Sequence, residues 1–235
     1  MPSTLKKLKI YIPALILLLL IVIARLKTNI PINVFLSDPA VIAGSNGLSS
    51  LIQATTNPFV GVASNIGILC WCISASVCFF SCFLIRKKLM PYSNGYKELF
   101  NFLLLSGLIT SVLLIDDLFL LHEAIIPKLL KIPQYLTYSL YMVTVFYWIN
   151  RFRKIIIKTE WDLLALAFIF FTFSIFTDTA MDYFELSNHM NILSNNELLV
   201  LLEDGFKLFG IISWLTYLSK TSLLIIETII EGERL

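Results

Sequence analysis

Charged side chains are scarce in this chain of 235 residues: Asp, Glu, Lys and Arg make up 14% of it, and hydrophobic residues make up 57%. Ordinary soluble domains have about 25% charged and about 45–50% apolar residues. The mean hydropathy is +0.82. A soluble globule of this composition would leave too much apolar surface in water, so the composition excludes a soluble domain. The net charge of +2 gives no sign of a nucleic-acid partner, and we expect none.

Histidine is rarer still, and its scarcity excludes several kinds of metalloenzyme. With His122 and His189 alone, the chain lacks the three-histidine site of ceramidase-like seven-helix hydrolases. It also lacks the S-G-H core of membrane phosphatases and the H-E-x-x-H motif of zinc proteases. The stretch "DTAMD", Asp178–Asp182, resembles the D-x-x-x-D of membrane prenyltransferases, but their second motif, N-D-x-x-D, is missing. The four cysteines lie between residues 70 and 82, at spacings that do not fit a zinc site.

Long apolar runs are what the chain has in abundance. A membrane-spanning helix needs about 20 apolar residues, and the sequence predicts an all-α, polytopic transmembrane helix bundle of six spans, with a seventh as the alternative. It forms one integral membrane domain over residues 1–235. Short interfacial helices are expected in the outer loops, at "SDPAVIAG" and "KLLKI". The tail from Thr221 either extends the last helix or lies along the surface. The predicted spans are Ile10–Ala24, Val60–Ile85, Leu99–Glu123, Gln134–Asn150, Asp162–Tyr183 and Leu198–Leu218.

Basic residues predict the orientation, because cytoplasmic loops carry an excess of Lys and Arg. With both termini cytoplasmic, thirteen basic residues lie on the cytoplasmic side and four on the other. The outer four are Arg25, Lys27, Lys128 and Lys131. Trp148 and Trp161 fall at the predicted inner boundary, where an interfacial aromatic belt is expected. The chain is therefore predicted to be an integral membrane protein with both termini in the cytoplasm.

Carboxylates interrupt the third, fifth and sixth spans at one depth. Counted from the inner end of each span, one carboxylate in each, Asp116, Asp178 and Glu203, falls roughly 24 Å up an apolar core about 30 Å thick. Ionisable groups inside a bilayer are costly, face the bundle interior and mark functional sites by default. Carboxylate-rich sites favour hard cations, so we expect a divalent cation, Mg²⁺, Ca²⁺ or Mn²⁺ rather than Zn²⁺. The predicted metal ligands are Asp116, Asp117, Asp178, Asp182, Glu203 and Asp204.

The stretch "DDLFLLHE", Asp116–Glu123, adds a histidine to these carboxylates. His122 can act as a general base, and we predict His122 and Asp117 as the catalytic residues. The leading hypothesis is a metal-dependent, membrane-embedded enzyme of the hydrolase type that acts on a lipid or lipid-linked substrate from the outer side. Two alternatives stay open: a cation- or proton-coupled transporter or channel, and a non-catalytic subunit or assembly factor. The expected partners are membrane lipid and either a second copy of the chain or another membrane protein.

Overall fold

The computed structural model describes residues 8–28, 30–37, 58–88, 96–188 and 197–231, and within these ranges regular structure is helical. The side chains of residues 88, 123, 124, 128 and 181–188 lie outside this description. The interfacial helix predicted at "SDPAVIAG" falls almost wholly within residues 38–57, which also lie outside it. The all-α class predicted from the sequence is therefore confirmed for the described part of the chain.

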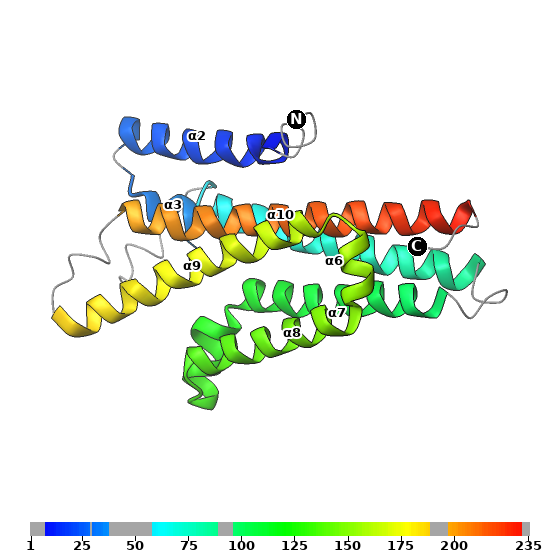
Figure 1. The fold of residues 1–235 in the computed structure, drawn as a ribbon. Coiled ribbons are helices and arrows are strands. Elements are labelled where there is room, and N and C mark those ends of the chain that lie inside the picture. Colours follow the sequence, from blue (N-terminus) through cyan, green and yellow to red (C-terminus); the bar gives the residue numbers. More distant parts are fainter. Residues whose placement is uncertain (1–7, 29, 38–57, 89–95, 189–196, 232–235) are drawn as a thin grey trace. The chain divides into compact units, whose positions relative to one another are not determined.

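The helices follow one another as drawn in Figure 1. They are η1 (Lys9–Tyr11), α2 (Ile12–Thr28), α3 (Ile32–Leu36), α6 (Val62–Lys88), α7 (Lys97–Phe119), η3 (Leu121–Leu130), α8 (Gln134–Lys158), α9 (Trp161–Asn188) and α10 (Glu197–Ile230). Within the described residues, four stretches are long and apolar enough to cross a membrane: Lys9–Thr28, Val62–Lys87, Lys97–Phe119 and Trp161–Ala180. They coincide with the first, second, third and fifth predicted spans, as expected of a multi-pass membrane protein.

The fourth and sixth predicted spans are also helices, but they are not among these four apolar stretches. The fourth corresponds to α8, which has 25 residues, and the sixth to α10, which has 34. Helix α10 continues without a break to Ile230. The tail from Thr221 therefore extends the last helix, which was one of the two predicted alternatives.

The chain divides into two compact units. The first comprises residues 1–67 and 165–213, and the second comprises residues 68–164 and 214–235. Helices α6, α9 and α10 each contribute residues to both units. The organisation as one integral membrane domain stays a prediction.

In the first unit, two polar contacts tie the ends of α2 and η1 to α10. The Arg25 guanidinium donates from Nε to both carboxylate oxygens of Glu197, at 2.9 and 2.7 Å. The hydroxyls of Tyr11 and Ser213 lie 2.6 Å apart. Between these contacts α2 packs on a small apolar core with α3 and the start of α6. The buried residues of that core are Ile21, Ile32, Phe35, Leu36 and Ala63.

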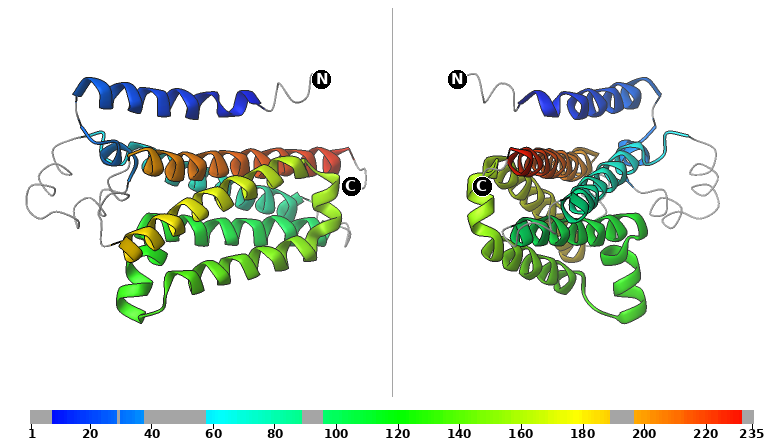
Figure 2. Two further views of the ribbon diagram at one scale, coloured as in Figure 1. Left: turned by 60° about the vertical axis from the view of Figure 1, so that its left-hand side comes forward. Right: turned by 90° about the vertical axis from the view of Figure 1, so that its right-hand side faces the viewer.

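In the second unit, α7, η3 and α8 form a helical hairpin, and Figure 2 shows α7 and α8 side by side. Helix α6 packs closely on α7 because Gly107 has no side chain. A Cβ atom at this position would lie 3.0 Å from the Phe79 ring and 3.1 Å from Cys78 Cβ. Small residues let membrane helices approach one another in this way.

One predicted helix end and one predicted tryptophan role are wrong. The third span was predicted to run to Glu123, but α7 ends at Phe119 because Leu120 is left-handed, with φ 51° and ψ 46°. Helix α8 continues beyond the predicted span end at Asn150, but it is interrupted at Phe152, whose φ and ψ are not helical. Trp148 is fully buried rather than part of an interfacial belt, whereas Trp161 is 57% exposed.

Candidate functional site

The left-handed residue at the end of α7 determines the geometry of the "DDLFLLHE" stretch. The backbone N–H of Leu120 donates to the Asp116 carbonyl and closes the last turn of α7. The chain then continues as η3, a π-helical segment in which the Ile125 N–H donates to the Leu120 carbonyl at 3.2 Å. π-Helical segments occur frequently at functional sites. Leucine has no intrinsic preference for the left-handed region, so the surrounding contacts hold it there.

This change of direction brings His122 back onto the side chain of Asp116. The His122 backbone N–H donates to Asp116 Oδ1 at 3.0 Å. The His122 ring nitrogen Nδ1 lies 2.6 Å from Asp116 Oδ2. Tyr141, on α8, adds a side-chain hydrogen bond to the same carboxylate. Both Asp116 and His122 are buried, so Asp116 is a buried carboxylate held by donors from the other two segments of its own hairpin.

The histidine ring is itself held against α8. Its centroid lies 5.2 Å from that of Tyr138, with the ring planes tilted at 45°. Packing of this kind limits rotation of the imidazole, while the Nδ1 contact with Asp116 selects its tautomer. The position of the His122 ring is thus fixed from two sides.

Asp117 lies beside this pair but has a different partner. The indole Nε1–H of Trp71, on α6, donates to Asp117 Oδ2 at 2.8 Å. Both groups are buried. The sequence-based prediction named His122 and Asp117 as the catalytic residues, and in the structure the His122 ring contacts the carboxylate of Asp116.

Trp71 begins a row of three buried tryptophans, Trp71, Trp214 and Trp148, which we call the indole row. They come from α6, α10 and α8, all from residues of the second unit. The ring centroids of Trp71 and Trp214 lie 6.2 Å apart, and those of Trp214 and Trp148 lie 5.7 Å apart. Aromatic pairs attract one another at these separations, so the row is a continuous packed element.

Each indole of the row donates to a polar side chain on one face of α7. Besides the contact with Asp117, Trp214 Nε1 donates to Thr110 Oγ1 and Trp148 Nε1 donates to Ser106 Oγ, both at 3.0 Å. Positions 106, 110 and 117 are spaced by four and seven, so they share a helix face. The indole row therefore satisfies the buried polar groups that α7 presents to the bundle.

Together these contacts form a site suited to proton transfer. A carboxylate that accepts a hydrogen bond from His Nδ1 orients the ring and stabilises its protonated form. The same carboxylate–histidine arrangement also orients metal-binding histidines. Within the described residues, however, no three His, Cys, Asp or Glu side chains gather into a group that could hold a metal ion.

The other predicted ligands belong to the first unit. Asp178 on α9 and Glu203 and Asp204 on α10 are half-buried, and Asp182 is on α9 with its side chain outside the described part. The convergence of all six carboxylates on one ion stays a prediction. Of the predicted site residues, the structure brings Asp116 and His122 into direct contact.

Sequence reasoning missed the partners of these residues, namely Trp71, Tyr138 and Tyr141. The hydroxyl positions Ser106 and Thr110 share a helix face with Asp117, and that spacing was the available signal for a buried polar face on α7. No comparable spacing links a tryptophan on α6 to a carboxylate on α7, because contacts between helices leave no periodic trace in the chain.

Comparison with known proteins places the chain in a family. No curated protein and no solved structure matches it. A family model described as "Domain of unknown function (DUF8692)" matches residues 12–221. This match begins at the first residue of α2 and ends within α10, so it includes the Asp116–His122 pair and the whole indole row. The chain therefore belongs to the DUF8692 family.

Proposed function

We propose that this protein is a membrane-embedded enzyme of the hydrolase type, with the Asp116–His122 pair as its general base and a lipid or lipid-linked molecule as its substrate. The observation that carries the proposal is the 2.6 Å contact between His122 Nδ1 and Asp116 Oδ2. Its burial supports this role, because water that does not reach a carboxylate cannot compete for its hydrogen bonds. A non-catalytic subunit would need no such oriented base.

The proposed chemistry uses the second ring nitrogen of the imidazole, Nε2. His122 Nε2 takes a proton from a water molecule, and the water oxygen bonds to the carbonyl carbon or the phosphorus of the substrate. The bond to the leaving oxygen then breaks, and the proton on Nε2 passes to that oxygen. Asp116 stabilises the imidazolium between these two steps. General acid–base catalysis of this kind contributes about 10²–10⁴-fold to the rate.

The surroundings of the pair favour an amphiphilic substrate. Helix α7 is one of the stretches that are apolar enough to cross a membrane, and the pair lies at its C-terminal end. In η3 beyond it, Leu129 and Leu130 expose 75% and 64% of their surface. Apolar side chains exposed beside a membrane helix contact lipid at little cost. A lipid substrate would therefore reach this site without leaving the membrane.

The indole row counts against a proton-coupled transporter. A proton relay needs groups that both accept and donate hydrogen bonds, and an indole N–H only donates. The two hydroxyls on this face of α7 are already engaged, because Ser106 donates to the Phe102 carbonyl and Thr110 donates to the Ser106 carbonyl, at 2.7 and 2.8 Å. The described contacts on this face of α7 therefore do not form a chain of groups that could pass a proton along.

Flux measurements test this second candidate. The protein in vesicles that contain a pH-sensitive dye should show no proton uptake above that of protein-free vesicles when a pH gradient or a membrane potential is imposed. Uptake that Asp117→Asn abolishes would contradict the enzyme proposal and favour the transporter.

We also propose six spans, with α8 and α10 crossing the membrane and both termini cytoplasmic. The distribution of basic residues supports this topology. Reporter fusions after Lys87 and after Lys154 should read cytoplasmic, and a fusion after Lys131, between η3 and α8, should read external. A cytoplasmic reading at Lys131 would put the Asp116–His122 pair on the other side and would reject the topology.

A divalent cation bound by the predicted carboxylates is a further part of the proposal. Elemental analysis of the purified protein tests it, with Asp178→Asn as the comparison. Stoichiometric Mg, Ca or Mn in the wild type and a loss in the variant would support the cation. An absence of metal in both would leave the Asp116–His122 base as a metal-independent one.

The enzymatic activity can be tested on a mixture of lipids, before the substrate is identified. The protein is reconstituted in vesicles made from a total membrane lipid extract, and the lipids are compared by mass spectrometry before and after incubation. We expect one lipid class to decrease while its hydrolysis products increase. An unchanged lipid profile for the wild type, with His122→Gln identical to it, would reject the proposed function for the lipids in that extract.

A further inference from the structure

Helix α8 bends sharply near its C-terminal end, at Phe152, whose φ of −113° and ψ of 19° are not helical. Figures 1 and 2 show the chain turning here, between the long part of α8 and the start of α9. The stretch from Gln134 to Arg151 is about 27 Å long at about 1.5 Å per residue, close to the hydrocarbon thickness of about 30 Å. If α8 crosses the membrane, as proposed above, the bend lies where it reaches the membrane surface.

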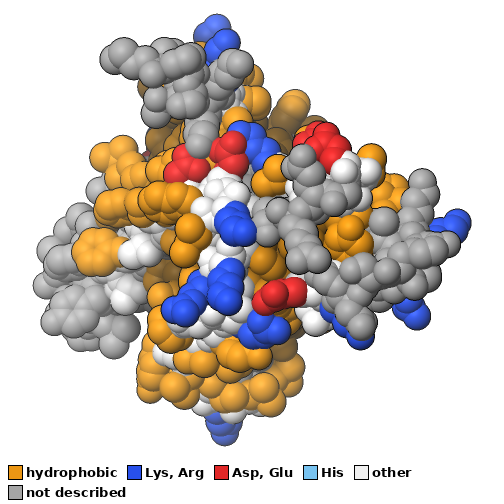
Figure 3. All heavy atoms as spheres, turned by 45° about the vertical axis from the view of Figure 1, so that its right-hand side comes forward, with side chains coloured by type: hydrophobic (Ala, Val, Ile, Leu, Met, Phe, Trp, Pro, Cys, Tyr) orange, Lys and Arg blue, Asp and Glu red, His pale blue; other side chains and the backbone are white. Residues whose placement is uncertain are grey.

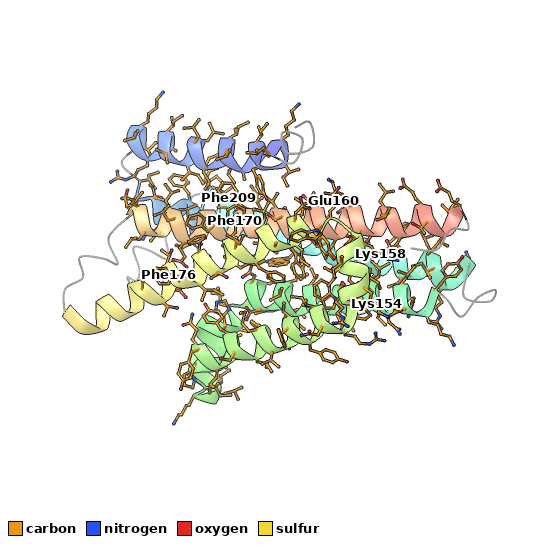
Figure 4. The ribbon with its side chains drawn as sticks, viewed as in Figure 1. Lys154, Lys158, Glu160, Phe170, Phe176 and Phe209 are labelled. Atoms are coloured by element: carbon orange, nitrogen blue, oxygen red, sulfur yellow. The ribbon has the colours of Figure 1, made fainter. Side chains whose placement is uncertain are left out.

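The segment after the bend, Phe152–Lys158, has two different faces, and we call it the turned segment. Phe152, Ile155 and Ile156 are buried. Its three basic residues, Arg153, Lys154 and Lys158, are exposed. Figure 4 labels Lys154 and Lys158 on this part of the chain. The segment is therefore anchored by its apolar face and presents cations on the other.

The neighbouring charges are already paired. Arg151 contacts Glu98 at 3.2 Å, and Lys220 contacts Glu160 at 3.4 Å. In the part of the chain that the structure describes, no carboxylate pairs with the three basic residues of the turned segment. These three side chains can therefore bind an anion from outside the protein.

Exposed apolar side chains lie directly beside them. Ile157 is 70% exposed and Trp161 is 57% exposed. Figure 3 shows Lys and Arg side chains gathered on one face, with an acidic side chain beside them and hydrophobic side chains around them. Basic residues mixed with exposed Ile and Trp are typical of a segment in the plane of a membrane interface. A soluble anion would make no contacts with the apolar side chains, whereas a lipid would contact both the basic and the apolar groups.

We propose that the turned segment is a binding site for the headgroup of an anionic phospholipid in the cytoplasmic leaflet. Arg153, Lys154 and Lys158 bind the phosphate oxygens through charge-assisted hydrogen bonds. Ile157 and Trp161 lie at the boundary with the acyl chains. The segment holds the inner end of α8 at the membrane surface through this lipid, independently of the chemistry at the other end of the helix.

Trp161 provides a local readout for this site. Three of the four tryptophans are the buried members of the indole row, so quenching by a lipid that carries bromine on its acyl chains reports mainly on Trp161. In phosphatidylcholine bilayers, brominated phosphatidylglycerol should quench the wild type more strongly than brominated phosphatidylcholine at the same mole fraction. Trp161→Phe should lose that difference.

The charge dependence of the binding completes the test. A basic residue near an anionic surface contributes about fivefold in affinity, so Arg153→Gln/Lys154→Gln/Lys158→Gln should weaken the preference for phosphatidylglycerol by on the order of a hundredfold. A triple variant with the same loss of charge elsewhere, Arg86→Gln/Lys87→Gln/Lys97→Gln, should keep most of it. Added salt should weaken quenching of the wild type by phosphatidylglycerol and leave quenching by phosphatidylcholine unchanged.

Three outcomes would overturn the proposal. Equal quenching of the wild type by the two brominated lipids would show that there is no headgroup preference. Equal losses in the two triple variants would reduce the effect to general surface charge. Displacement of phosphatidylglycerol by inorganic phosphate at a comparable concentration would mean that the site binds a soluble anion instead of a lipid.

Discussion

Lipid turnover should fall by about 10²–10⁴-fold when His122 is replaced with Gln, because the substitution removes the imidazole proposed as the general base. Glutamine is close to histidine in size and can still donate to Asp116, so the buried carboxylate keeps a partner. The loss should therefore be in kcat, with little change in thermal stability. Mass spectrometry of the reconstituted vesicles measures the turnover.

The matching substitution at the partner, Asp116→Asn, should reduce turnover by a similar factor for a different reason. Asparagine has a single acceptor oxygen, whereas the carboxylate accepts from both the His122 backbone N–H and the ring Nδ1. The neutral amide also fails to stabilise the imidazolium. Unlike His122→Gln, this variant leaves a buried donor unsatisfied, and we expect it to lose about 1–3 kcal/mol of stability.

Two comparisons make this result specific. His189→Gln removes the other histidine of the chain and should leave turnover unchanged. His122→Gln/Asp116→Asn should be no worse than either single variant, because residues that act as a unit are not additive. If the single variants retained full turnover, the pair would have no catalytic role and would be a structural hydrogen-bonded pair.

Replacing Trp214 with Ala should have the largest effect on stability, a loss of about 3–5 kcal/mol in the free energy of unfolding. The side chain is buried at the centre of the indole row, where it packs against Trp71 and Trp148 and donates to Thr110. Its removal leaves a cavity between three helices and an unsatisfied acceptor. Thermal unfolding in detergent, followed by circular dichroism, measures the loss.

Trp161→Ala is the matched control for this prediction, since it removes the same side chain from an exposed position. Its effect in detergent should stay within about 0.5 kcal/mol of the wild type. Trp214→Phe separates packing from hydrogen bonding, because it keeps an aromatic ring and removes the N–H. A loss for Trp214→Ala no larger than that for Trp161→Ala would mean that the row does not hold the second unit together.

Hydropathy predicted the positions of the helices well because a membrane span needs a long apolar run and the chain contains little else. Their ends were harder to predict. Leu120, where α7 stops, has no glycine or proline beside it, and a leucine in the left-handed region carries no signal in the sequence. At the end of α8, Arg151 and Lys154 suggested a boundary, and the helix is interrupted there, at Phe152, before it continues to Lys158.

The Asp116–His122 pair illustrates the same difficulty. In a straight α-helix, residues 116 and 122 would lie about 9 Å apart along the axis and about 120° apart around it. A straight helix would separate Asp117 from His122 by about 140°, so it would bring neither carboxylate onto the imidazole. The sequence indicated that carboxylates and a histidine gather near the end of this span, whereas the contact of Asp116 with His122 depends on the left-handed conformation of Leu120. The contacts of Asp117 and Thr110 with tryptophans depend on packing between helices, which no local pattern encodes.

The hairpin of α7, η3 and α8 also has a consequence for biogenesis. An aspartate in an inserting helix costs free energy, up to roughly 2.5–3.5 kcal/mol at the helix centre on the scale set by the translocon and less towards the ends. The donors to Asp116 come from His122 and Tyr141, so its carboxylate is hydrogen-bonded as soon as this hairpin has entered the bilayer. The partner of Asp117 is Trp71 on α6, which is synthesised before α7. The contact of Thr110 with Trp214 forms later, because α10 is synthesised last. The charged end of α7 is therefore stabilised during synthesis, before the last helices of the protein have left the ribosome.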